Sequence, residues 1–126
     1  MDYNRVNIKK DRIIHNKSVK EWRLEQKLRL GSIISSRLKI CGEDKKAIAF
    51  MIKSIPNFNE LSRTSSNETI ISAFCFYILK TRKSNAQIEQ YAVLKEYGLN
   101  EKIYATIITR LCNYYQKKVL TYYTDL

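Results

Sequence analysis

Three cysteines and one histidine are the side chains of this chain that most readily bind metals or act as nucleophiles. Cys41, Cys75 and Cys112 are far apart, form no C-x-x-C pair and are odd in number. This spacing predicts buried, reduced thiols in an intracellular protein rather than a disulfide framework. The only histidine, His15, lies in a polar N-terminal stretch, where we expect it to be solvated. We therefore expect no metal site and no Cys–His catalytic pair.

The carboxylates do not form a catalytic pattern either. Glu43 and Asp44 are adjacent and could be read as a metal-binding pair. Acids at the start of a helix explain them better, because the helix dipole favours negative charge there. The sequence has no phosphate-binding glycine loop, no dinucleotide fingerprint and no zinc-protease or serine-hydrolase motif. We therefore expect a protein that is not an enzyme and needs no cofactor.

The chemistry that the composition favours is the binding of a polyanion. The 126-residue chain has 23 Lys and Arg against 12 Asp and Glu, a net charge of +11. Residues 1–40 hold 11 of these cations and 4 of the acids, so they alone carry +7. Because each neutralised phosphate releases counterions, DNA is the first candidate partner. The alternative is a lysine-rich surface that serves only solubility.

Residues 1–17 have no sustained period and are predicted to be a basic N-terminal arm. Such an arm could follow a groove or a phosphate backbone of DNA. The cations that would do so are Arg5, Lys9, Lys10 and Arg12. The alternative is a plain disordered tail.

The composition favours one globular, mainly helical domain. The chain is 44% hydrophobic with only three glycines and one proline, and its length suffices for a core without disulfides. The longest apolar run, Thr69 to Leu79, is too short to span a bilayer, and no signal-peptide pattern precedes it. We expect an intracellular protein of the cytoplasm and nucleoid, or of a nucleus, with no membrane partner.

Hydrophobic spacing and capping residues predict five helices within residues 18–120. The helices are expected at about 18–39, 43–55, 67–82, 86–97 and 100–120, and residues 121–126 form a C-terminal tail. Ser18, Ser66, Ser84-Asn85 and Asn100 are the predicted N-caps of four of them.

The first and third predicted helices are the most apolar. The first is expected to be mostly buried, with Trp22 and Ile33 in its core face and Gly31 permitting the close approach of another helix. The third is apolar on all sides apart from Thr69 and Ser72, so the other four helices should surround it. A central third helix ringed by four others is the plan of the cyclin-box fold.

The residues of the third helix resemble a known family. The segment Arg63-x-x-Ser66-x-Glu68-x-Ile70-x-x-Ala73, followed by Phe76 and Lys80, is similar to the start of the third helix in the core repeats of archaeal transcription factor B and eukaryotic general transcription factor IIB. The resemblance covers about residues 22–118. It implies an all-α, five-helix cyclin-like domain with a buried central third helix and a helix-turn-helix-like C-terminal half.

The resemblance also implies a function. A domain of this family docks on promoter DNA, on the TATA-binding protein or on RNA polymerase. Its DNA contacts would come from the starts of the fourth and fifth helices, where this chain has Arg82, Lys83, Asn85, Asn100, Lys102 and Tyr104. The alternative for these residues is a solvated capping region.

The chain also departs from the family pattern. Thr64 replaces the family's glycine, and the stretch from Ile88 to Ile103 is longer by about four residues, roughly one helical turn, which could distort the helix-turn-helix. The family's zinc ribbon and second repeat are missing from the sequence. We therefore expect a single repeat that acts as an accessory protein or regulator of transcription.

Two other interpretations remain open from the sequence. The first is a helical protein-interaction module without specific DNA binding, whose basic surface faces an acidic protein. The second is an unrelated helical bundle. The high Ile, Lys, Asn and Tyr content points to an AT-rich genome, such as that of a virus or plasmid.

Overall fold

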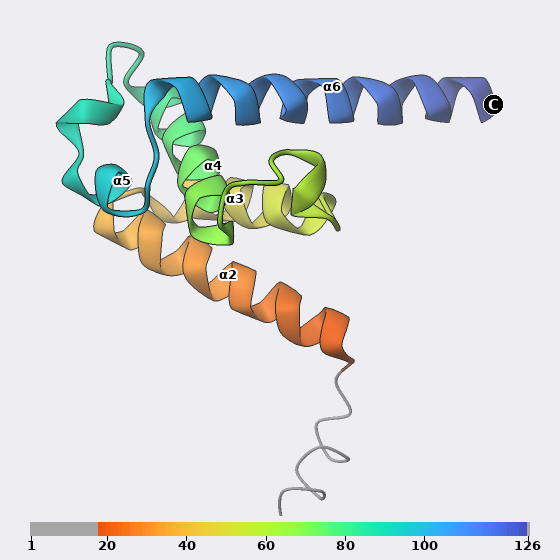
Figure 1. Ribbon diagram of the computed structural model, residues 1–126, viewed down its shortest axis with the longest axis horizontal. Helices are drawn as coiled ribbons and strands as arrows, with labels where there is room; N and C mark the ends of the chain where they lie inside the picture. The colour runs from red at the N-terminus through yellow and green to blue at the C-terminus, as the bar shows by residue number, and fades with distance from the viewer. Residues whose placement is uncertain (1–17, 126) are drawn as a thin grey trace, which may run out of the picture.

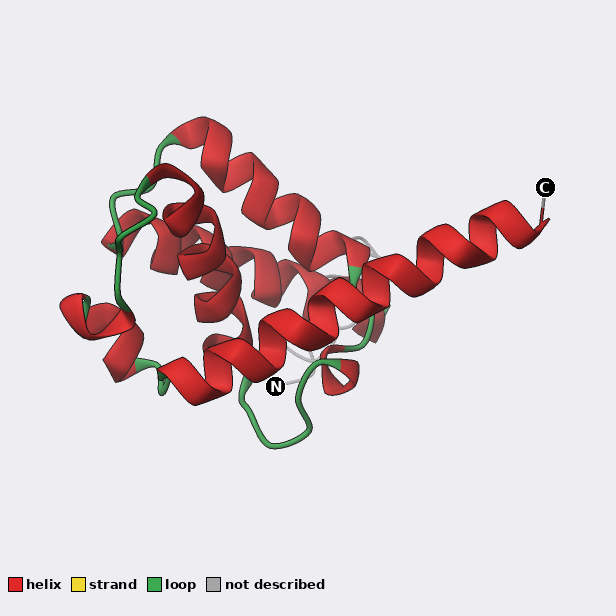
Figure 2. Ribbon diagram, turned by 90° about the horizontal axis from the view of Figure 1, so that it is seen from above, coloured by secondary structure: helices red, strands yellow, loops and turns green. Residues whose placement is uncertain are grey.

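The computed structural model describes the backbone of residues 18–125 and the side chains of residues 18–118. Within this range the chain is all-helical and has no strand, as predicted (Figures 1 and 2). Its α-helices are α2 (Val19–Arg37), α3 (Gly42–Ser54), α4 (Asn67–Arg82), α5 (Ala92–Glu96) and α6 (Glu101–Asp125), and its 3-10 helices are η1 (Phe58–Glu60) and η2 (Ile88–Gln90). None of these helices is long and apolar enough to cross a bilayer.

Helix α2 begins where the sequence predicts. The Ser18 side chain caps it by accepting a hydrogen bond from the Glu21 backbone N–H at 3.1 Å. The expectation that α2 is mostly buried is wrong, however, because Trp22 is 55% and Ile33 44% exposed. Only the second half of α2, around Ile34, lies fully in the core.

Gly31 brings α2 and α3 close together, as predicted. A Cβ atom at this position would lie 2.8 Å from Ile52 Cδ1, and Ile48 and Ile71 also come within contact distance. Helix α3 ends at Ser54, and Ile55 is extended because the following residue, Pro56, disfavours helical geometry before it.

Helix α4 is the most buried element of the described chain. Ser66 caps it by accepting from the Thr69 N–H, and every residue from Thr69 to Phe76 is buried. The helix contacts α2, α3 and α6, and the Phe74 ring meets the Phe58 ring edge-on at 5.6 Å. The first exposed side chain after this buried run is Tyr77, which is 39% exposed.

The predicted fourth helix, Ala86–Tyr97, is not continuous. Residues 86–87 have no regular structure, η2 takes the next three residues, Tyr91 is extended (φ −120°, ψ 105°), and only five residues form α5. The buried side chains of Ala86 and Ile88, and the Tyr91 ring 6.3 Å from Phe76, turn this segment back onto α4. The prediction of one continuous fourth helix over Ala86–Tyr97 is therefore wrong.

The end of α5 follows the prediction closely. Gly98 has a φ of +81°, and its N–H and that of Leu99 bond to the carbonyls of Lys95 and Leu94. This is a Schellman motif, in which a glycine takes the left-handed position at low cost. Thr69 Oγ1 donates to the Tyr97 carbonyl at 2.6 Å, so α4 holds the same turn.

Helix α6 starts at the predicted cap, since Asn100 Oδ1 accepts from the Ile103 N–H at 2.8 Å. The helix runs to Asp125, so residues 121–125, predicted as a tail, are helical. Ile107 and Leu111 bury it against the body, and its C-terminal half projects beyond the other helices (Figures 1 and 2).

The cysteine prediction is only partly correct. Cys75 lies in the core, but Cys41 and Cys112 are exposed. Cys41 is the N-cap residue of α3, and Cys112 lies on the outer side of α6.

Candidate nucleic-acid interface

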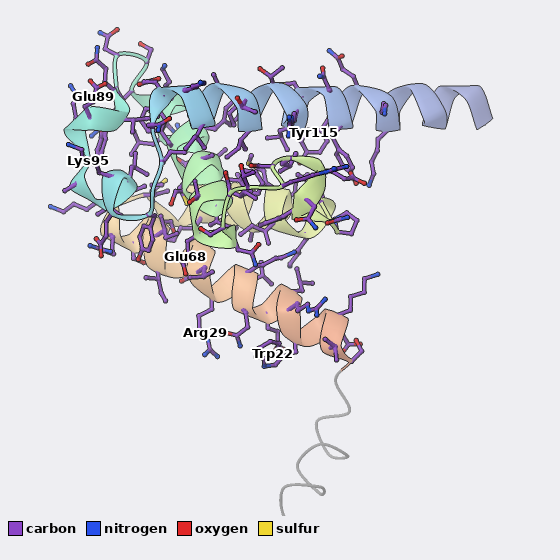
Figure 3. The ribbon with its side chains drawn as sticks, in the orientation of Figure 1. Trp22, Arg29, Glu68, Glu89, Lys95 and Tyr115 are labelled. Atoms are coloured by element: carbon purple, nitrogen blue, oxygen red, sulfur yellow. The ribbon has the colours of Figure 1, made fainter. Side chains whose placement is uncertain are left out.

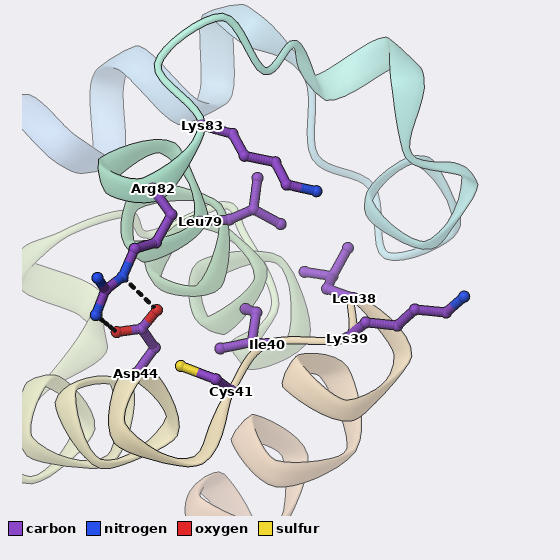
Figure 4. Close-up of a pocket in the computed structure, with 8 residues that line it drawn as sticks. All are labelled: Leu38, Lys39, Ile40, Cys41, Asp44, Leu79, Arg82 and Lys83. Carbon is purple, nitrogen blue, oxygen red and sulfur yellow. Dashed lines mark hydrogen bonds and ion pairs between the residues drawn. The ribbon is translucent and has the colours of Figure 1, made fainter.

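The face predicted at the start of the fourth and fifth helices is only partly available to a ligand. Arg82 donates two hydrogen bonds of 3.1 Å to the Asp44 carboxylate (Figure 4). This bonding holds the pKa of Asp44 below its usual value and raises that of Arg82. Arg82 would have to leave this carboxylate before it could bind a phosphate.

Two further residues of the predicted face have structural roles. Tyr104 is half-buried, with its ring 5.1 Å from Phe76, and burial raises its pKa to about 12. Asn100 uses its side-chain oxygen to cap α6. Lys83, Asn85 and Lys102 are exposed as predicted. Lys83 and Asn85 precede η2, and Lys102 lies in the first turn of α6.

A small pocket lies beside Arg82, between the end of α2, the start of α3 and the end of α4 (Figure 4). Its volume is about 390 Å³, and it is lined by Leu38, Lys39, Ile40, Cys41, Asp44, Leu79, Arg82 and Lys83. The Asp44 carboxylate offsets part of its positive charge. The pocket is therefore less suited to a polyanion than its three cations alone would suggest.

The larger concavity of the described chain lies at the other end of α2. It has a volume of about 1050 Å³ between the first turns of α2, the end of α3, residues 55–59 and α6. We call it the basic groove, after the five cations that line it: Lys20, Arg23, Lys27, Lys53 and Lys118. Glu21 is the only acid among the described residues of its lining. The groove therefore has a large excess of positive charge.

Within residues 18–118 the cations of the groove have no carboxylate partner. The ion pairs Arg37–Glu96 and Arg82–Asp44 include none of them. Burial and the neighbouring Arg23 charge lower the pKa of Lys27, whose ammonium lies 4.0 Å from the Phe58 ring centre. The smaller part of this pKa shift comes from the like charge of Arg23, and a bound anion would relieve that repulsion.

Hydrogen bonds attach α6, which forms one side of the groove, to the end of α3. The Tyr115 and Ser54 hydroxyls are 2.6 Å apart, and the Tyr114 hydroxyl donates to the Ser54 carbonyl at 3.2 Å. These bonds fix α6 against the end of α3, and Lys118 of α6 and Lys53 of α3 both line the groove. Arg110 ties α6 to the Leu61 carbonyl in the same way.

Amide and apolar side chains line the groove together with the cations. Gln26, Asn57, Asn59 and Asn67 line the groove together with Val19, Trp22, Leu24 and Pro56. Trp22 stands at the edge, and Figure 3 shows it with Arg29 on the side of α2 that faces away from the other helices. The lining thus offers hydrogen-bonding groups and flat apolar surface as well as charge.

The sequence contained one signal for this groove. Residues 1–40 carry +7, and Lys20, Arg23 and Lys27 repeat at helical spacing on one face of α2. Lys53 and Lys118 could not be assigned to the same place, because only the fold brings them there.

The arm cations Arg5, Lys9, Lys10 and Arg12, like His15, lie outside the described residues. Within the described part, no group of three or more His, Cys, Asp or Glu residues could hold a metal ion.

Comparison of the chain with protein-family models, with curated proteins and with solved structures finds no match.

Proposed function

We propose that this protein binds nucleic acid through the basic groove and acts as a DNA-associated accessory protein or regulator of transcription. One observation carries the proposal: among the described residues, five cations from three helices line one groove with a single acid. The N-terminus of α2 adds the positive end of a helix dipole to this groove. The resemblance to transcription factor B supplies the transcriptional setting, with the TATA-binding protein or RNA polymerase as proposed protein partners.

The test is a titration of labelled DNA at two sodium chloride concentrations. The groove variant carries Arg23→Gln and Lys53→Gln, and the control carries Lys46→Gln and Lys95→Gln, two exposed cations outside the groove lining. Wild-type affinity should fall steeply with salt. For each phosphate that the groove variant no longer binds, the slope of log K against log salt should become shallower by about 0.7–0.9.

The control variant has the same net charge as the groove variant, so any purely global effect of charge affects both equally. Equal affinity losses in the two variants would contradict the assignment to the groove. A third variant, Lys83→Gln with Lys102→Gln, tests the face predicted from sequence. If it alone loses affinity, DNA binds there and the groove has another role.

A second candidate function is a protein-interaction module, and exposed apolar side chains favour it. Val19, Trp22, Ile33 and Phe50 are 44–67% exposed on α2 and α3. Purified TATA-binding protein or RNA polymerase would be tested for direct binding. A complex that Ile33→Asp abolishes and the groove variant retains would favour this candidate.

A further inference from the structure

We infer that the ligand of the basic groove is a single strand of nucleic acid, with its phosphates on the cations and its bases against the lining between them. This inference rests on the proposed function and specifies which form of nucleic acid the groove accepts.

The shape of the groove is the first argument. Its positive charge lies around a concavity of about 1050 Å³ rather than on a convex ridge or an exposed recognition helix. A duplex is read by an element that enters one of its own grooves, such as a helix in the major groove. Single strands, in contrast, follow positively charged grooves in the proteins that bind them.

The chemistry of the lining is the second argument. The side chains of Asn59 and Asn67 are exposed and form no hydrogen bond with the rest of the described chain, and Asn57 uses only its oxygen, as acceptor for the Asn59 N–H at 3.0 Å. Amide groups of this kind can bond to the Watson–Crick edges of bases, which are free only in a single strand. The amide N–H groups can also donate to phosphates, but only bases offer partners to both the donor and the acceptor of an amide.

The apolar side chains of the lining are the third argument. Val19 and Pro56 are exposed in the groove lining, and Trp22 is exposed at its edge, on the outer side of α2, so its ring offers a face on which a base at the end of the groove can stack. In a duplex the base faces are covered by neighbouring base pairs. A strand with unstacked bases is the form of nucleic acid that can use apolar surface and cations together.

The charge of the chain argues against another occupant. The residues that precede α2 include Arg5, Lys9, Lys10, Arg12 and Lys17 against Asp2 and Asp11. A segment with this positive charge would be repelled by the groove cations, and a second copy of the folded domain is also basic. The groove therefore favours an anionic ligand over any part of this chain.

The experiment compares four ligands of the same length, using the full chain. They are a DNA strand, the RNA strand of the same sequence, the DNA duplex, and an abasic DNA strand that keeps every phosphate. Trp22 is the only tryptophan, so its fluorescence reports directly on the groove edge. We expect either natural strand to bind more tightly than the duplex and to quench Trp22. The abasic strand should bind at least about tenfold more weakly, the loss of roughly one stacked base.

Two pairs of variants locate the base contacts. Trp22→Ala is matched by Phe50→Ala, another exposed aromatic residue outside the groove, and Asn59→Ala by Asn85→Ala, another exposed amide. Circular dichroism would verify that all four fold. Only Trp22→Ala and Asn59→Ala should weaken binding of the natural strand, and they should leave binding of the abasic strand unchanged.

The outcomes separate this inference from the proposed function. Equal affinity for the natural and abasic strands, or tighter binding of the duplex, would overturn the single-strand inference while leaving salt-dependent nucleic-acid binding in place. No salt-dependent binding of any of the four ligands would overturn both.

Discussion

At the scale of single residues, burial distinguishes three cysteines for which the same environment is predicted from the sequence. Cys41, Cys75 and Cys112 were all expected in the core, yet only Cys75 is buried there. Burial raises the pKa of the Cys75 thiol to about 12. The thiolate is the nucleophilic form of cysteine. Near neutral pH the Cys75 thiol is therefore unreactive, because it is protonated and because reagents cannot reach it.

Alkylation of the native protein should therefore modify two thiols per chain, with the third reacting only after unfolding. Mass spectrometry of the protein treated with iodoacetamide, with and without denaturant, measures this count. The Cys41→Ser, Cys112→Ser double variant is the control, and it should take up no label until it unfolds. Rapid modification of Cys75 in the native state would contradict the burial described for α4.

At the scale of elements, one glycine sets how closely α2 and α3 pack. Gly31 Cα faces Ile52, and a Cβ there would come within 2.8 Å of its Cδ1 atom. Ile52 is 1% exposed, so it has little space into which to move. By contrast, a Cβ at Gly42, in the first turn of α3, would meet nothing within 4 Å.

Gly31→Val should lower the free energy of unfolding by about 1–3 kcal/mol, since added methyl groups overpack a filled core. Gly42→Ala should leave the stability unchanged or raise it by about 0.4–1 kcal/mol, because it restricts the unfolded chain. Urea unfolding followed by circular dichroism measures both. A Gly31→Val protein as stable as the wild type would show that α2 and α3 can separate without cost.

Local signals explain which elements could be predicted from the sequence. Ser18, Ser66 and Asn100 each cap a helix through a bond to a residue three positions on, so the sequence alone contains the complete cap. The break at Tyr91 depends instead on Phe76, fifteen positions earlier in the chain, and no local pattern contains that contact. The basic groove shows the same difference. Its cations on α2 repeat at helical spacing in the sequence, whereas those on α3 and α6 join them only through the fold.

At the scale of the whole molecule, charge opposes folding. The chain has a net charge of +11, and the folded state holds these cations closer together than the unfolded chain does. Burial is the main cause of the lowered pKa of Lys27, and the neighbouring Arg23 charge adds a smaller, local contribution from this repulsion. The two ion pairs of the described part join α2 to α5 and α3 to α4, so they do not offset the charge at the groove.

The Tm of the protein should accordingly rise as sodium chloride is added, because salt screens repulsion between exposed charges. Chloride is used rather than sulfate, which stabilises folded proteins by exclusion from their surface. The Arg23→Gln, Lys53→Gln variant should melt higher than the wild type at low salt and respond less to added salt. A Tm that is flat or falls with salt would mean that attractive pairs dominate the surface.

The place where residues 1–17, expected to form a basic arm, join the described chain has a consequence for affinity. Val19 lines the basic groove, so residue 17 is attached at the groove edge through Ser18. A chain spans at most ~3.6 Å per residue, which keeps Arg12 within roughly 22 Å of Ser18 in any conformation. A strand held in the groove would meet the arm cations at the high effective concentration of a short tether. A variant that begins at Ser18 would then bind the strand more weakly than the full chain, because it lacks the cations of residues 1–17.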